Sequence, residues 1–167
     1  MLFTDDRFGD RDADWEAAAR KAGLVVVRAR DAKRRAALAE RLSGIAPLLI
    51  AGDGALAARI GAAGLHLPEA RAGEAPSWRV RHPDWIITAT AHSLGALMGA
   101  RQVDAVFLSP VFATKSHPGA AHLSPVRAGL IAAAATVPVY ALGGVMARNA
   151  ARLPPSFSGI AAIGSLL

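Results

Sequence analysis

Short apolar runs alternate along the chain with longer stretches in which apolar residues recur at helical spacing. Runs rich in Val, Ile and Leu predict buried strands, and apolar residues three or four positions apart predict amphipathic helices. The predicted strands cover residues 2–4, 24–28, 47–50, 64–67, 85–90, 103–108, 137–142 and 160–163. The predicted helices cover 14–22, 32–42, 55–60, 93–100, 123–135 and 147–153, and the polar segment 69–83 is expected to be irregular.

Eight strands that alternate with helices indicate a parallel sheet with right-handed crossovers. Two architectures fit this order: a closed (β/α)8 barrel and an open doubly wound sheet. The count of eight favours the barrel, as do glycines directly after the late strands, where barrels commonly bind phosphate. At 167 residues the chain is shorter than the roughly 200 or more typical of this fold. We therefore predict one domain over residues 1–167, an α/β protein with a compact (β/α)8 TIM barrel, shortened helices and a missing or truncated last helix.

Composition and charge narrow the function classes. Hydrophobic residues make up 53% of the chain and Cys is absent, which excludes a disulfide framework, a thiolate zinc site and a Cys nucleophile. The formal net charge is +6, but the Arg residues are scattered without aromatic interleaving, so we do not expect a nucleic-acid partner. No apolar run is long enough to span a bilayer and Met1 begins no signal-peptide pattern, so we expect a cytoplasmic protein without a membrane partner.

The segment after the predicted strand 103–108 is the richest in chemistry. It carries Ser109, Thr114, Lys115 and His117, and two prolines stiffen it. Hydroxyl, ammonium and imidazole groups at the carboxyl end of a strand suit an anionic small molecule. Glycines follow two later strands, as Gly143-Gly144 and as Gly164-Ser165. Because amide donors at glycine turns suit a phosphate dianion, these loops predict one shared phosphate site.

Charged and titratable residues lie at the ends of other strands. Arg28 and Arg30 project to the same side of the predicted strand 24–28, and two inward cations at a barrel mouth require an anion. His92 follows the strand 85–90 and either shuttles a proton or neighbours the helix cap at Ser93. His66 is either a hydrogen-bonded structural residue or a ligand contact.

Several short motifs occur in the same order as in one known family. They are Phe3-Thr4-Asp5, Gly64-Leu65-His66-Leu67-Pro68, Thr90-Ala91-His92-Ser93, Ser109-Pro110-Val111-Phe112-Ala113-Thr114 and Leu142-Gly143-Gly144-Val145. In this order they resemble the thiamine phosphate synthase and thiazole tautomerase superfamily. The resemblance implies a (β/α)8 barrel that binds a thiazole phosphate. The synthase branch joins this phosphate to a hydroxymethylpyrimidine pyrophosphate and releases pyrophosphate with Mg²⁺.

The resemblance also implies roles for individual residues. The thiazole phosphate would bind at Gly143, Gly144, Gly164 and Ser165, with Thr90, Ser109, Lys115 and His117 as further substrate or phosphate contacts. The catalytic candidates are His92, which matches the acid/base residue of the tautomerase branch, together with Arg28, Arg30 and Thr114.

Two positions depart from the synthase pattern in a way that concerns the metal. Gly52 and Arg71 stand where the family places Mg²⁺-binding carboxylates. Asp53 and Glu69 are nearby acids, and Asp53 is the candidate substitute ligand. Mg²⁺, however, demands near-octahedral oxygen geometry. We therefore predict that the chain lacks a strong Mg²⁺ site.

Three functions remain open on the sequence. The chain is a synthase-like transferase of thiamine biosynthesis with an altered metal site, or a tautomerase-like isomerase, or a non-catalytic protein that binds a thiazole or thiamine phosphate. In each case the partner is a phosphorylated small molecule, and a homodimer is compatible with the sequence.

Overall fold

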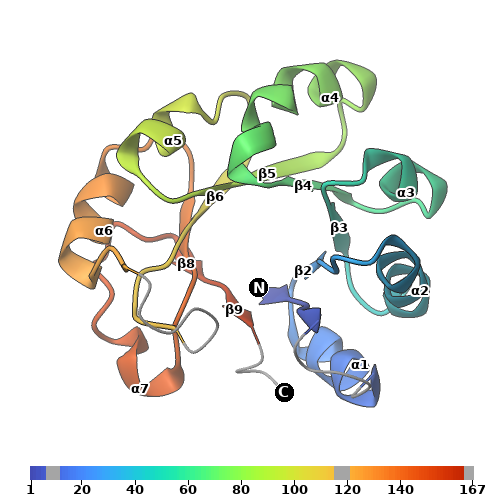
Figure 1. Ribbon diagram of the computed structural model, residues 1–167, viewed down its shortest axis with the longest axis horizontal. Coiled ribbons are helices and arrows are strands. Elements are labelled where there is room, and N and C mark those ends of the chain that lie inside the picture. The colour runs from blue at the N-terminus through green and yellow to red at the C-terminus, as the bar shows by residue number, and fades with distance from the viewer. Residues whose placement is uncertain (7–11, 115–120, 164–167) are drawn as a thin grey trace.

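The strands form a closed parallel barrel with the helices outside it (Figure 1). The computed structural model describes residues 1–6, 12–114 and 121–163. In these residues the strands are β1 (Leu2–Phe3), β2 (Val25–Val27), β3 (Leu48–Ala51), β4 (Gly64–Leu67), β5 (Ile86–Ala91), β6 (Ala105–Leu108), β7 (Val139–Ala141), β8 (Gly159–Ile160) and β9 (Ala162–Ile163). They pair in the order β8-β7-β6-β5-β4-β3-β2-β1-β9, which confirms the predicted barrel over the open sheet.

The barrel closes through one short segment near residue 161. The predicted strand 160–163 is divided into β8 and β9, and only Ala161 separates them. β8 pairs with β7, whereas β9 pairs with β1 in the register Leu2↔Ala162 and Phe3↔Ile163. The segment therefore supplies hydrogen bonds to both remaining sheet edges, which removes the open edges that an unclosed sheet would carry.

The helices are short, as the sequence predicts. They are α1 (Asp12–Lys21), α2 (Ala32–Leu42), α3 (Gly54–Arg59), the 3-10 helix η2 (Glu69–Glu74), α4 (Ala75–Arg81), α5 (Leu94–Gly99), α6 (Pro125–Ala133) and α7 (Ala147–Ala150). The predicted helix 147–153 is too long, because the chain tightens into a turn after Ala150, just before Pro154. The predicted truncated last helix lies outside the described residues. None of the helices in the described ranges has the length and apolar character needed to cross a bilayer.

The prediction that residues 69–83 are irregular is wrong. The segment folds as η2 followed directly by α4. Pro76 suits the start of α4, because the first turn of a helix has no use for its missing N–H. Glu74 joins the two helices, since its carboxylate accepts hydrogen bonds from Arg71 and from the Trp78 indole. Because polar side chains make these contacts, the sequence of this segment does not show the helical spacing of apolar residues that would have predicted it.

Side chains alternate between the barrel interior and the helix layer, as a pleated strand requires. The interior cluster holds Phe3, Val26, Leu49, Phe107 and Leu142, one each from β1, β2, β3, β6 and the residue after β7. Their neighbours along the strands, such as Val25 and Val27 on β2, belong to a separate cluster beneath the helices. The barrel is therefore a filled core rather than a pore.

Aromatic rings fill the middle of the barrel. The Phe3 and Phe107 ring centroids lie 4.8 Å apart at an interplanar angle of 85°. The imidazole of His66 on β4 stands edge-on to both rings, at 5.2 Å from Phe3 and 5.4 Å from Phe107. Edge-to-face contacts of this kind add to the free energy gained from burial.

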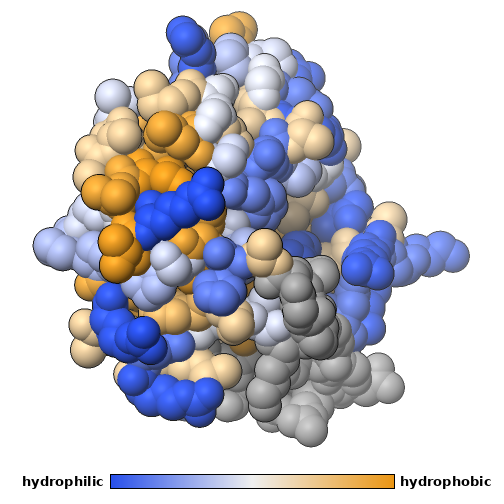
Figure 2. Space-filling model, turned by 60° about the vertical axis from the view of Figure 1, so that its left-hand side comes forward, coloured by the Kyte–Doolittle hydropathy of each residue, from blue (hydrophilic) through white to orange (hydrophobic). Residues whose placement is uncertain are grey.

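One outer face of the barrel is apolar and exposed to solvent. Leu94 and Met98 on α5 and Val126 and Leu130 on α6 are 46%, 56%, 72% and 70% exposed. Each pair is spaced i, i+4 and so shares one face of its helix. Figure 2 shows hydrophobic side chains gathered on this side of the molecule.

Truncating the central ring should destabilise the barrel strongly. We expect Phe107→Ala to lower the free energy of unfolding by about 3–5 kcal/mol, because it removes a fully buried ring and leaves a cavity. Urea denaturation followed by circular dichroism measures this. The control is Val80→Ala on α4, whose side chain is 83% exposed and whose loss should change stability by less than about 0.5 kcal/mol. Equal effects of the two changes would contradict the assignment of Phe107 to the core.

Candidate active site

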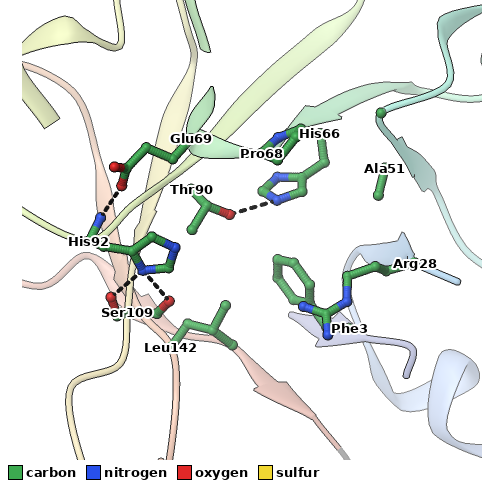
Figure 3. A pocket seen from close by; sticks show the side chains of 11 residues that line it. Phe3, Arg28, Ala51, His66, Pro68, Glu69, Thr90, His92, Ser109 and Leu142 are labelled. Atoms are coloured by element: carbon green, nitrogen blue, oxygen red, sulfur yellow. Dashed lines mark hydrogen bonds between the residues drawn. The ribbon is translucent and has the colours of Figure 1, made fainter. Parts of the chain in front are cut away.

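A cavity of about 320 Å³ opens at the carboxyl ends of the strands (Figure 3). This is the end of a (β/α)8 barrel at which active sites lie. Its lining comes from strands β1, β3, β4 and β5 and from the segments that follow β2, β3, β4, β5, β6 and β7. The lining residues are Phe3, Arg28, Ala51, Gly52, His66, Pro68, Glu69, Thr90, His92, Ser109 and Leu142.

Residues at the end of β1 fix Arg28 at the cavity edge. The Thr4 hydroxyl donates to the Arg28 carbonyl at 2.9 Å and accepts from the Arg28 amide at 2.8 Å. The buried Asp5 carboxylate accepts from the Arg28 guanidinium at 2.9 Å. Because Arg28 is half exposed and keeps further N–H donors, it can bind an anion while it stays paired with Asp5.

Arg30, which the sequence analysis pairs with Arg28, lies outside the cavity lining. β2 ends at Val27, so both Arg28 and Arg30 lie beyond the strand on which the sequence places them. Arg30 is exposed, and its amide donates to the Asp6 carboxylate at 2.7 Å. Arg30 is not part of the cavity lining, whereas Arg28 is.

The buried His66 and its partner Thr90 form a polar part of the cavity wall. His66 Nδ1 is 2.9 Å from the Thr88 hydroxyl, and Nε2 is 2.9 Å from the Thr90 hydroxyl. Burial lowers the pKa of His66 from 6.5 to about 3, and the charge of Arg28 adds to this effect. The imidazole is therefore neutral at physiological pH and fixes the Thr90 hydroxyl at the cavity wall.

His92 is held in one tautomer. Its Nδ1 lies 2.6 Å from the backbone carbonyl oxygen of Ser109. A carbonyl oxygen can only accept, so Nδ1 carries a proton and donates it, while Nε2 has no hydrogen-bond partner among the described residues. Figure 3 shows the His92 ring beside Thr90 and Leu142, with only Nδ1 bonded to Ser109. Ser93 caps α5 by accepting from the Ala96 amide, and the His92 imidazole takes no part in this cap.

Two glycines next to the cavity approach a neighbouring loop too closely for a side chain. A Cβ at Gly143 would lie 2.7 Å from Pro110 Cα, and a Cβ at Gly144 would lie 2.9 Å from Phe112 Cβ. Both have positive φ, 87° and 66°. The Asn149 side chain holds the turn by donating to the Gly144 carbonyl at 2.8 Å. Within the described residues neither glycine amide N–H has a hydrogen-bond acceptor, so both are available to an anion.

The structure brings some of the predicted site residues together. Arg28, Thr90, His92 and Ser109 line one cavity, and Gly143 and Gly144 directly follow its lining residue Leu142. Thr114 is half-buried in the loop after β6 and does not line the cavity. Asp53 caps α3. The predictions for Lys115, His117, Gly164 and Ser165 lie outside the described residues.

Sequence reasoning missed two groups that position the site. Asp5 stands at the carboxyl end of the first predicted strand, and that position was a usable signal for a rim residue. Asn149 gave no signal, because its contact with Gly144 depends on the turn before α7.

The fold and the rim cavity place the chain among the (β/α)8 barrels. Residues 1–166 match the family model described as thiamine monophosphate synthase, so the chain belongs to that family. This confirms the resemblance on which the sequence analysis relied.

The names of two individual relatives are consistent with this family. The chain is 36% identical over 92 residues to the "Putative thiamine-phosphate synthase 2" of Aquifex aeolicus (strain VF5), a match that covers 54% of this chain and 49% of that protein. It is 32% identical over 116 residues to the "Thiamine biosynthesis bifunctional protein ThiM/ThiE" of Symbiobacterium thermophilum, covering 67% and 24%. The chain thus spans half or less of the length of these two relatives. The solved thiamine phosphate pyrophosphorylase from Pyrococcus furiosus superposes with a TM-score of 0.78 over 97% of this chain and 83% of that one; at 20% identity it supports the fold.

The buried His66 should make stability depend on pH. Its folded pKa of about 3 lies below the ordinary 6.5, so between these values the unfolded chain takes up a proton that the folded chain does not. The free energy of unfolding should therefore fall as the pH drops below 6.5, by about 2 kcal/mol at pH 5. Urea denaturation of wild type and His66→Gln at a series of pH values measures the difference.

The variant should have a flatter pH dependence in this window than the wild type. The control is His122→Gln, which changes an exposed histidine and should leave the wild-type slope intact. The same slope in wild type and His66→Gln would show that His66 is not the group responsible.

Proposed function

We propose that this chain is a thiamine phosphate synthase-type transferase that joins a thiazole phosphate to a hydroxymethylpyrimidine pyrophosphate. Family membership supports the reaction class. The observation that carries the proposal is that one barrel rim collects an arginine, a histidine and two glycine amides that have no acceptor among the described residues. Two anion-binding elements on one rim suit a reaction with two phosphorylated substrates.

The coupling step needs charge stabilisation more than proton transfer. The thiazole nitrogen attacks the methylene carbon of the pyrimidine, and the bond from this carbon to the pyrophosphate oxygen breaks. Pyrophosphate leaves with the electron pair, and the ring nitrogen becomes a cation. Arg28 is placed to bind the departing pyrophosphate, and the amides of Gly143 and Gly144 are placed to hold the thiazole phosphate.

The residues at the implied metal positions do not fit Mg²⁺. Arg71 donates to the Gly52 carbonyl at 2.7 Å and to both carboxylate oxygens of Glu74 at 2.6 and 2.7 Å. The Gly52 carbonyl, which could otherwise bind a cation, thus already accepts a hydrogen bond from the Arg71 guanidinium. No group of three His, Asp or Glu side chains in the described ranges could hold a metal ion.

Asp53 is committed to other partners. Its Oδ1 accepts from the Leu56 amide and its Oδ2 from the Arg35 guanidinium, both at 3.0 Å. The Leu56 hydrogen bond is the main cause that lowers the pKa of Asp53, and the Arg35 pair adds to it. Mg²⁺ would have to displace a helix cap and an ion pair. We therefore infer that the chain works without a strong Mg²⁺ site, with Arg28 and the glycine amides binding the phosphates.

A second function is favoured by the tautomer of His92. In its neutral form the His92 imidazole, held by Nδ1, can take a proton at Nε2 from one carbon of a thiazole ring and return it to another, which is an isomerisation without net proton loss. The tautomerase-like reading thus stays the alternative, and a protein that binds without turnover is the third outcome of the tests below.

Removing the charge of Arg28 should impair coupling. We expect Arg28→Met, which keeps an unbranched stem, to lower kcat/KM for thiamine phosphate formation by about 10- to 100-fold, because one charge-assisted contact is lost. Pyrophosphate release and product formation are measured together, with and without EDTA. The control is Arg59→Met, an exposed α3 residue outside the cavity lining, which should leave the rate unchanged.

The EDTA arm tests the metal inference separately. Turnover that survives EDTA, and calorimetry that detects no micromolar Mg²⁺ binding with pyrophosphate present, are the expected results. A rate that EDTA abolishes would show that Asp53 or another acid binds Mg²⁺ after all. Absence of coupling under every condition would leave the isomerase or the binding protein.

His92 separates the two catalytic functions. We expect His92→Ala to abolish any isomerisation of an aminothiazole phosphate, because it removes the imidazole that would transfer the proton and no Cys is available to replace it. Phosphate affinity, measured by calorimetry, should survive because it depends on Arg28 and the glycine amides. Isomerisation at the wild-type rate would remove His92 from the mechanism.

A further inference from the structure

Glu69 is a carboxylate in the cavity wall that the proposed chemistry does not yet use. It begins η2, directly after Pro68, and lines the cavity. One oxygen, Oε2, accepts from the backbone amide of His92 at 2.6 Å. Among the described residues no Lys, Arg or His side chain forms an ion pair with Glu69. Its negative charge and one oxygen therefore remain available.

The cavity is bipolar as a result. Glu69 and His92 lie together on the β4–β5 side, and Arg28 lies across the cavity on the β2 side (Figure 3). The first side presents the Glu69 carboxylate and His92 Nε2, which has no hydrogen-bond partner among the described residues. The second side presents guanidinium donors. A ligand that satisfies both sides carries an anion and, several bonds away, a cation or an amino group.

We propose that Glu69 is a specificity-determining residue that recognises a positively charged or amino-bearing heteroaromatic ring. This inference rests on the proposed coupling reaction, in which the thiazole nitrogen gains a positive charge as its new bond forms. The described cavity walls otherwise consist of apolar side chains, hydroxyls, two imidazoles and one arginine. A carboxylate without a counter-ion is placed to stabilise the charge that develops there.

A purely structural role is the competing explanation. The bond from the His92 amide to Glu69 also anchors the loop between β5 and α5, and any residue with an acceptor oxygen could do this. Gln has the same size and keeps an acceptor oxygen, but it has no charge. Glu69→Gln therefore removes the proposed recognition and preserves the anchor, whereas Glu69→Ala removes both.

The experiment compares two ligands of which only one carries a cationic ring and an amino group. Calorimetry measures the binding of thiamine phosphate, which has a cationic thiazolium and an aminopyrimidine, and of thiazole phosphate, which has a neutral ring and no amino group, to wild type, Glu69→Gln and Glu69→Ala. We expect Glu69→Gln to weaken thiamine phosphate by about tenfold, the scale of one contact to a charged group. Thiazole phosphate should keep its wild-type affinity within twofold, so the selectivity between the two ligands falls.

The other outcomes overturn the inference in distinguishable ways. Unchanged binding of both ligands by Glu69→Gln, with a loss for both in Glu69→Ala, would show that Glu69 only anchors the loop. An equal loss of affinity for both ligands in Glu69→Gln would show that the Glu69 charge does not distinguish one ligand from the other. If the wild type binds neither ligand, the proposed function fails and this inference fails with it.

Discussion

The edge-to-face contacts among Phe3, His66 and Phe107 are the constraint on which the rim depends. These rings are almost fully buried in the barrel, and Phe3 and His66 also line the cavity. Because burial keeps His66 neutral, its imidazole can hold Thr88 on one side and Thr90 on the other. The apolar core and the polar rim are thus parts of one packing arrangement.

Each functional group at the rim is held by a residue from another element of the fold. Arg28 after β2 is held by residues at the end of β1, and His92 after β5 is held by the carbonyl of Ser109 after β6. Gly144 after β7 is held by Asn149 of α7. Such cross-links order the side chains before a ligand arrives, which lowers the entropy lost on binding.

Residue periodicity predicts the parts of the fold that burial dictates. The apolar run at residues 64–67 is strand β4, and the rule that parallel strands end on one rim places His92 and Ser109 together. Residue periodicity fails where polar contacts replace burial, as in η2 and α4, whose junction depends on the contacts of Glu74 with Arg71 and Trp78. The division at Ala161 could not be predicted either, because it arises from closing the barrel and not from a local preference.

Barrel closure has a consequence for the order in which the protein is made. Among the described strands β1 leaves the ribosome first and β9 last, yet each supplies the edge that the other needs. A nascent chain that has already paired β1 with β2 still presents an open edge on β1 until residues 162–163 have been synthesised. An open edge can pair with another chain, so the interval before closure is when this protein is most exposed to aggregation. The hydrogen bonds between β1 and β9 end that interval, and they mark the moment at which the rim acquires its shape.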